Sequence, residues 1–176
     1  MEVLLAIATL LGGITALWFF WDKISAWLSG GMNVNSHDVG LYEEYKQLFI
    51  SNGVAEFYRQ HDFLGSFGEE LWRPLSRYVD NWHTVEHEFT HKKLNKLHKK
   101  VYENAAELGG AIAKYTVPIG PGGHMRAVKP DYIPIGPIPE HIKEEAREIN
   151  SLVPEFIKAH ESFVRYANRK LGKGNA

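Results

Sequence analysis

The sequence contains no cysteine among its 176 residues. That absence excludes a disulfide framework and any zinc site built on thiolates, so a metal would need His, Asp or Glu ligands. The sequence also lacks an excess of positive charge, because 20 Lys and Arg stand against 21 Asp and Glu, for a formal net charge of -1. A nucleic-acid-binding domain usually carries a clear basic excess, so we expect no nucleic-acid partner.

Almost no stretch shows the alternation of apolar and polar residues that marks a half-buried strand. Apolar residues recur instead at spacings of three and four, which is typical of helices. The predicted helices span residues 38–50, 54–61, 69–82, 84–116 and 140–171. Five prolines between Pro118 and Pro137 predict a Pro/Gly-rich crossover, and Pro154 should kink or divide the last helix. The predicted fold class is all-α, with a bundle of about five helices.

Charged residues are absent from residues 3–21, VLLAIATLLGGITALWFFW. A helix of about 19 residues is just long enough to cross the hydrocarbon core of a bilayer. A cleaved signal peptide and a buried core helix are the alternatives, but this segment has neither a positively charged start nor a small-residue cleavage site. The sequence therefore predicts an N-terminal transmembrane helix, with residues 1–30 as a single-pass membrane anchor and residues 31–176 as a soluble helical-bundle domain.

Aromatic residues at the end of this segment are typical of the membrane interface. The expected anchoring residues are Trp18, Trp21, Lys23 and Trp27. The positive charge of Lys23 follows the span, which favours a cytoplasmic location for the body. Ala8, Gly12 and Ala16 form a helix-helix seam of small residues, which either brings two anchors together or faces lipid without a partner.

Residues 87–91, HEFTH, fit the H-E-x-x-H pattern of zinc peptidases. In those enzymes two histidines one turn apart on a helix bind zinc, and the glutamate activates a water molecule. His87 and His91 have that spacing within a predicted helix that Thr84 would cap. The alternative is that the pattern arose by chance in the acid-rich first turn of this helix, with Phe89 packing inward.

The neighbourhood of this pattern argues against zinc. Lys92 and Lys93 follow it directly, and two ammonium groups oppose the binding of a dication. Glu103 and Glu107 lie three and four turns further along the same predicted helix, where they cannot reach a metal at the pattern. We therefore rank a zinc peptidase last among the possible activities.

A second set of residues matches the order of metal ligands in HD-type metal-dependent phosphohydrolases. His37 is followed by the pair His61 and Asp62, and then by Asp131. Polar residues precede the pair, and Asp131 falls in the crossover, both of which depart from that family's pattern. The alternative reading is that Asp38 and Asp62 cap helices or close turns through their carboxylates.

Five lysines lie within residues 92–100, at the start of the longest predicted helix of the body. Such a basic face is usually solvated. It could instead contact anionic headgroups or an acidic face of the last helix. The acidic residues of that face are Glu140, Glu144, Glu145 and Glu148.

Three segments, SHD at 36–38, HDF at 61–63 and EHEF at 86–89, resemble a family of small bacterial helical proteins without an established activity. The similarity covers residues 36–171. It implies a bacterial source, and it implies that the second histidine of HEFTH is not a required feature.

These observations predict a membrane-anchored helical interaction protein, either a sensor, an adaptor or an effector, in the bacterial inner (cytoplasmic) membrane. The expected partners are the lipid bilayer and a protein, or a second copy bound through the anchor. No cofactor and no catalytic residues are expected. The alternative is the metal-dependent phosphohydrolase, with His37, His61 and Asp62 as metal ligands.

Overall fold

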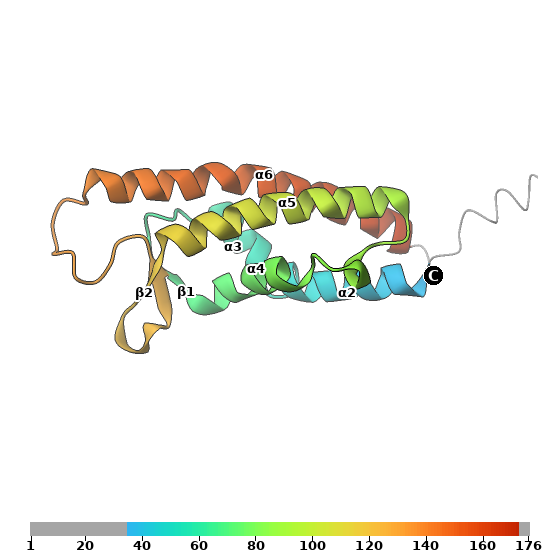
Figure 1. The fold of residues 1–176 in the computed structure, drawn as a ribbon, viewed down its shortest axis with the longest axis horizontal. Helices are drawn as coiled ribbons and strands as arrows, with labels where there is room; N and C mark the ends of the chain where they lie inside the picture. Colours follow the sequence, from blue (N-terminus) through green and yellow to red (C-terminus); the bar gives the residue numbers. More distant parts are fainter. Residues whose placement is uncertain (1–34, 173–176) are drawn as a thin grey trace, which may run out of the picture. The chain divides into compact units, whose positions relative to one another are not determined.

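The computed structural model describes residues 35–172, within a unit that begins at Asn35. Two long helices, α5 (Lys92–Tyr115) and α6 (Glu140–Leu171), lie side by side and run antiparallel (Figure 1). Three shorter helices pack against this pair: α2 (Ser36–Phe49), α3 (Val54–Gln60) and α4 (Glu69–Asn81). The helical-bundle prediction is confirmed for this part of the chain.

Aromatic side chains fill the space between the helices. The largest fully buried ones are Tyr45, Phe49, Tyr58, Phe63, Tyr78, Phe156 and Phe163. Most of their contacts are edge-to-face or tilted, as between Tyr45 and Phe163, whose ring centroids are 4.9 Å apart. Each such pair adds roughly 0.5–1.5 kcal/mol to the free energy gained by burying apolar area. Ring pairs thus join α2 and α3 directly to α6, as between Tyr58 and Phe156, and join Tyr78 of α4 to α2.

A small antiparallel sheet corrects the all-α prediction. Its strands are β1 (Phe67–Gly68), β3 (Met125–Ala127) and β2 (Val117–Ile119), in that spatial order. Strands of two or three residues are too short to show alternation in a sequence, which is why the pattern did not reveal them. Pro118 lies in β2 at the edge of the sheet, where a strand tolerates a residue without an N–H group.

Four of the five predicted helices begin and end within two residues of the observed ones. The helix predicted over 84–116 was wrong at its start, because α5 begins only at Lys92 and a short 3-10 turn, η1 (Val85–His87), precedes it. Pro154 lies inside α6, which is one continuous helix and is not divided there.

The membrane part of the prediction is corrected by the structure. Over residues 35–172, no helix is long and apolar enough to cross a bilayer. The longest helices, α5 and α6, have 24 and 32 residues, but charged side chains recur along both. The predictions of a transmembrane helix and of a bacterial inner-membrane location are corrected to this extent for residues 35–172, and the segment predicted to span the membrane, residues 3–21, lies outside them.

The residues on which the membrane prediction depended lie outside the described residues. They are the proposed anchoring residues Trp18, Trp21, Lys23 and Trp27 and the proposed helix-helix seam Ala8, Gly12 and Ala16.

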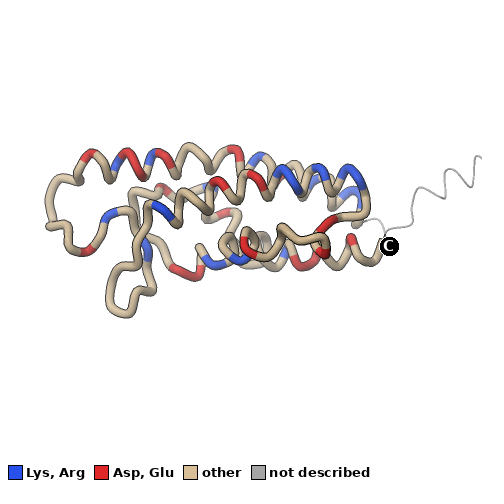
Figure 2. The backbone as a smooth tube through the Cα atoms, in the orientation of Figure 1, with Lys and Arg blue, Asp and Glu red and all other residues tan. Residues whose placement is uncertain are grey.

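The antiparallel pair argues against one alternative for the basic face, a contact with the acidic face of the last helix. The lysines at the start of α5 lie beside the end of α6, whereas the glutamates at the start of α6 lie at its other end (Figure 2). Glu140 pairs instead with Lys143 and Arg147 of its own helix, at 3.1 and 2.8 Å.

Candidate functional site

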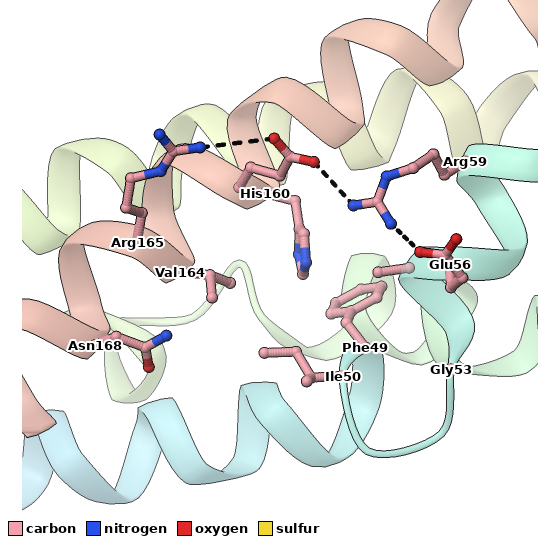
Figure 3. Close-up of a pocket in the computed structure, with 11 residues that line it drawn as sticks. Phe49, Ile50, Gly53, Glu56, Arg59, His160, Val164, Arg165 and Asn168 are labelled. Atoms are coloured by element: carbon pink, nitrogen blue, oxygen red, sulfur yellow. Dashed lines mark hydrogen bonds and ion pairs between the residues drawn. The ribbon is translucent and has the colours of Figure 1, made fainter.

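An open pocket of about 460 Å³ lies between the turn joining α2 to α3 and the second half of α6 (Figure 3). We call it the His160 pocket, because the imidazole of His160 points into it from α6. Its apolar wall consists of Phe49, Ile50 and Val164. Ile50 is 40 % exposed, which is high for a large apolar side chain beside the core. The pocket thus combines an accessible apolar wall with one buried imidazole.

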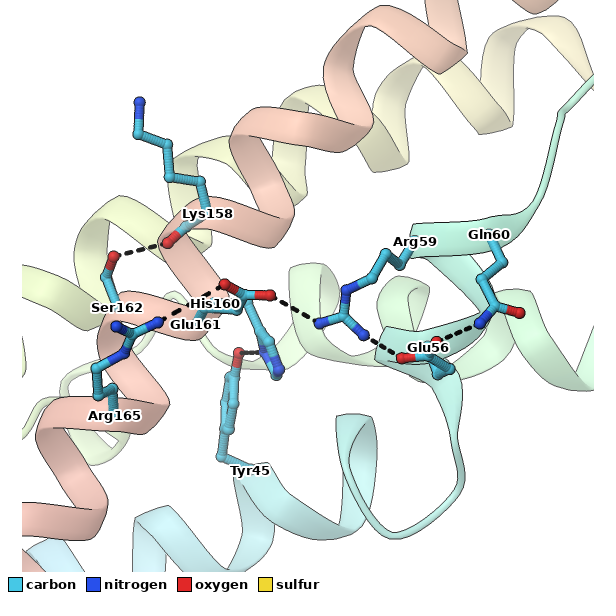
Figure 4. Close-up of polar contacts among 9 residues, drawn as sticks. All are labelled: Tyr45, Glu56, Arg59, Gln60, Lys158, His160, Glu161, Ser162 and Arg165. Carbon is cyan, nitrogen blue, oxygen red and sulfur yellow. Dashed lines mark hydrogen bonds and ion pairs between the residues drawn. The ribbon is translucent and has the colours of Figure 1, made fainter.

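His160 is held in place by Tyr45 of α2. The hydroxyl oxygen of Tyr45 lies 2.6 Å from Nδ1 of His160, and their rings stack at 5.7 Å between centroids (Figure 4). Tyr45 is fully buried, and His160 is only 5 % exposed. Both residues lie within helices that the aromatic core packs together, so this contact depends on the whole bundle rather than on a local turn.

Both partners of this hydrogen bond are neutral at pH 7. Burial raises the pKa of the Tyr45 hydroxyl well above its usual 10. Burial, and secondarily the positive charge of Arg59, lowers the pKa of His160 to about 4. Desolvation disfavours the charged form of each group, which explains why the two pKa values move in opposite directions.

The burial of Tyr45 also determines where the imidazole carries its proton. A buried hydroxyl hydrogen without an acceptor is costly, so Tyr45 donates its hydrogen bond to Nδ1 of His160. A neutral imidazole with an accepting Nδ1 carries its hydrogen on Nε2. Because Nδ1 is occupied by Tyr45, Nε2 is the nitrogen left to donate to a molecule in the pocket.

Charged side chains at the rim pair with one another. Glu161 of α6 lies 2.9 Å from Arg59 of α3 and 3.9 Å from Arg165 one turn further along α6 (Figure 4). Arg59 also pairs with Glu56. Two arginines and two glutamates balance in charge, and all four are at least two-fifths exposed, so these pairs add little stability. They fix the shape of the rim and leave its net charge near zero.

Asn168 contributes a second polar group to the pocket. Its Oδ1 accepts a hydrogen bond of 2.6 Å from the hydroxyl of Tyr42. With the oxygen occupied, the amide presents its N–H donors to other partners. The pocket therefore offers N–H donors from His160 and Asn168 beside apolar walls.

The predicted metal ligands do not converge. His37 lies in the first turn of α2, where its Nε2 is 3.2 Å from the backbone oxygen of Glu88. Asp62 follows α3 and binds Asn150 of α6, whereas α2 contacts α6 through Asn168. Residues 150 and 168 are about 27 Å apart along a helix that rises 1.5 Å per residue. These contacts place His37 and Asp62 at well-separated levels along α6.

His61 and Asp62 have structural contacts of their own. The carboxylate of Asp62 accepts hydrogen bonds from the backbone N–H of Leu64 at 3.0 Å and from Asn150 at 2.8 Å, which lower its pKa. The imidazole of His61 stacks on Phe57, with 4.7 Å between centroids, and burial lowers its pKa. The reading in which Asp62 closes a turn is confirmed. Asp131 likewise accepts a hydrogen bond from the N–H of Gly120 in the crossover.

Asp38 has a different role from the predicted cap of its own helix. Asn35 caps α2, accepting from the N–H of His37 at 2.9 Å. The carboxylate of Asp38 is 2 % exposed and accepts from the N–H and hydroxyl of Thr90 at 2.7 and 3.0 Å, and from the N–H of His91 at 3.0 Å. It thus supplies the negative charge at the start of α5, whose own first turn has no acidic residue.

The HEFTH residues are not on one helix face. His87 belongs to η1, where it packs on Trp82 at 4.7 Å between centroids. His91 is the N-cap of α5, and its Nδ1 accepts from the N–H of Leu94 at 3.3 Å. Phe89 between them is buried, as predicted. Over residues 35–172, no group of three or more His, Asp or Glu side chains is placed to hold a metal ion.

The reasoning from the sequence missed the pairing of Tyr45 with His160. The two residues are 115 positions apart and belong to no short pattern. A signal was nevertheless present, because His160 falls between Phe156 and Phe163 on the apolar stripe of α6. A histidine on such a stripe is a candidate for a buried polar contact.

Comparisons with known proteins give no relative for this chain. No family model matches it, and neither the curated proteins nor the solved structures contain a match. Any functional conclusion must therefore come from the geometry of the site itself.

Proposed function

We propose that residues 35–172 form a ligand-binding domain. Its ligand is a small, mostly apolar molecule with a carbonyl or carboxylate oxygen, and it binds in the His160 pocket. The observation that carries this proposal is the buried hydrogen bond between the Tyr45 hydroxyl and Nδ1 of His160, which leaves Nε2 as the donor that this imidazole can offer to the pocket it lines. An N–H donor at the base of an apolar pocket selects molecules that bring an acceptor.

The surroundings of His160 favour binding over catalysis. Its one described hydrogen-bond partner is the neutral hydroxyl of Tyr45, whose pKa is raised. The rim carboxylate of Glu161, the residue after His160, is engaged by Arg59 and Arg165. A histidine that acts as a general base is usually oriented by a carboxylate and works with a pKa near 7, whereas the pKa of His160 is about 4.

Three probe molecules of one length test the proposal: hexanoate, hexanamide and hexylammonium. The first two carry an acceptor oxygen, and the third carries only donors. We expect hexanoate and hexanamide to bind with similar affinity, because the rim has no net charge, and hexylammonium to bind at least tenfold more weakly. Equal binding of all three, or binding of none, would refute the proposal. Chemical shifts of Ile50 and Val164 in NMR spectra would follow the titration.

A double variant separates binding from folding. Changing His160 alone would leave the Tyr45 hydroxyl buried without a partner, which is destabilising. The combined change Tyr45→Phe and His160→Phe removes both polar groups and keeps two rings in the core, so we expect a folded protein that no longer distinguishes hexanamide from hexylammonium. Retained discrimination would show that another group selects the acceptor.

The expected binding of a protein partner stays a prediction. Tyr132 and Ile135, in the crossover, are 84 % and 104 % exposed and are the apolar side chains on which it can be tested.

A further inference from the structure

Two buried polar atoms on α5 have no hydrogen-bond partner. They are Nε2 of His98 and Oδ1 of Asn95, and His98 is only 3 % exposed. More than nine in ten buried polar groups in folded proteins are paired, because an unpaired one costs about 1–3 kcal/mol. His98 and Asn95 are three residues apart on a helix and therefore lie on the same face. Two such atoms on one helix face indicate a missing partner.

A cavity of about 290 Å³ adjoins both residues. It lies between the first half of α5 and the segment from Trp82 to Glu88 that precedes this helix, and it shares no lining residue with the His160 pocket. Rings form much of its wall. The ring of Trp82 lies 4.7 Å from the ring of His87 and 5.4 Å from the ring of His98, measured between centroids. Tyr102 also lines the cavity. The cavity thus suits a flat, apolar ring.

The charges around this cavity are paired. Glu88 and Lys99 form an ion pair of 2.7 Å at its edge, and Glu103 faces Lys100 at 3.5 Å. The buried His98 is neutral at pH 7, because burial lowers its pKa to about 4. A ligand in this cavity would therefore meet no uncompensated charge. The oxygen of Asn95 can only accept a hydrogen bond, so its partner must donate one.

We propose that this cavity is a second binding site, for a small uncharged aromatic molecule that carries an O–H or N–H donor. The donor binds Oδ1 of Asn95, the ring lies among Trp82, His87 and Tyr102, and a polar atom of the ligand reaches Nε2 of His98. The segment from Trp82 to Glu88 closes one side of the site. Residues 84–88 of this segment were predicted as the start of a helix, but in the structure they contain the short turn η1 and precede α5.

Phenol and toluene form a matched pair of probes, because they have nearly the same shape and only phenol carries a donor. We expect phenol to shift the resonances of the Trp82 indole and the His98 imidazole in a saturable way, and toluene to bind at least tenfold more weakly. Equal binding of the two probes, or no saturable shift with phenol, would overturn the proposal. The second outcome would indicate a cavity that holds water only.

Substitution of Asn95 gives an independent test. Asn95→Leu removes an unpaired buried acceptor from α5, so we expect a higher Tm together with the loss of phenol binding. Asn104→Leu is the matched control on the same helix, because the side chain of Asn104, unlike the oxygen of Asn95, has a partner: it donates a hydrogen bond of 3.0 Å to the backbone oxygen of Glu155. This control should lower Tm and leave phenol binding unchanged. A lower Tm for Asn95→Leu with unchanged phenol binding would contradict the proposal.

Discussion

Replacement of Asp38 by alanine tests how much one buried carboxylate stabilises the start of α5. The carboxylate accepts three hydrogen bonds, two from Thr90 and one from His91. A hydrogen bond to a charged group contributes about 1.5–3 kcal/mol. Thr90 is exposed and His91 is half-buried, so water can replace part of what is lost. We therefore expect the variant to lower the free energy of unfolding by about 3 kcal/mol, below the simple total of the three bonds.

Urea unfolding followed by circular dichroism measures this loss. With a slope of about 2 kcal/mol per M, the midpoint should fall by roughly 1.5 M without a change in slope. Thr90→Val is the matched variant, since it removes only the hydroxyl bond to Asp38 and should cost about 1 kcal/mol. A change below about 0.5 kcal/mol for Asp38→Ala would refute the reasoning, because surface substitutions away from special contacts have effects of that size.

Three further predictions concern stability and the state of His160. The pKa values of His98 and His160 are about 4 in the folded protein against 6.5 for a free histidine, so the unfolded chain binds more protons between these values. The free energy of unfolding should therefore be at its full value above pH 6.5 and should fall as the pH falls toward 4, by up to about 3 kcal/mol per histidine. Urea unfolding at pH 7 and at pH 4.5 measures this loss, and equal stability at the two pH values would contradict the prediction. Gly110→Ala should raise the free energy of unfolding by roughly 0.5–1 kcal/mol, because the added methyl group meets nothing within 4 Å. Gly109→Ala should raise it less, because the added methyl group would lie 3.4 Å from Val79. Thermal unfolding would show which variant is more stable, and a more stable Gly109→Ala would be inconsistent with this packing. Tyr45→Phe removes the hydroxyl that donates to Nδ1 of His160, so the imidazole should no longer be held in one tautomer. If NMR of this variant still shows a single tautomer with hydrogen on Nε2, Tyr45 does not fix the tautomer of His160.

Periodicity located the helices because each buries one apolar face against the same core. For α6, the predicted span of 140–171 agrees with the observed Glu140–Leu171. The start of α5 could not be predicted in this way. Its N-terminal charge comes from Asp38, more than fifty residues earlier in the sequence, and a contact of that kind leaves no local pattern.

The candidate site shows the same limit. HEFTH and the His61-Asp62 pair were visible because they are short patterns, yet their side chains make structural contacts with Trp82, Leu94 and Asn150. The pairing of Tyr45 with His160 joins two helices that are distant in the sequence, so only the packed bundle brings it together. Residues that line a pocket through tertiary packing need no characteristic spacing.

The proton position on His160 tests the central claim most directly. In a protein labelled with ¹⁵N in histidine, the ring nitrogens of His160 report which one carries hydrogen at pH 7. We predict a protonated Nε2 and an unprotonated Nδ1, together with a saturable shift of Nε2 when hexanoate is added. A proton on Nδ1, or an Nε2 resonance that does not respond to hexanoate, would contradict the proposed ligand-binding function.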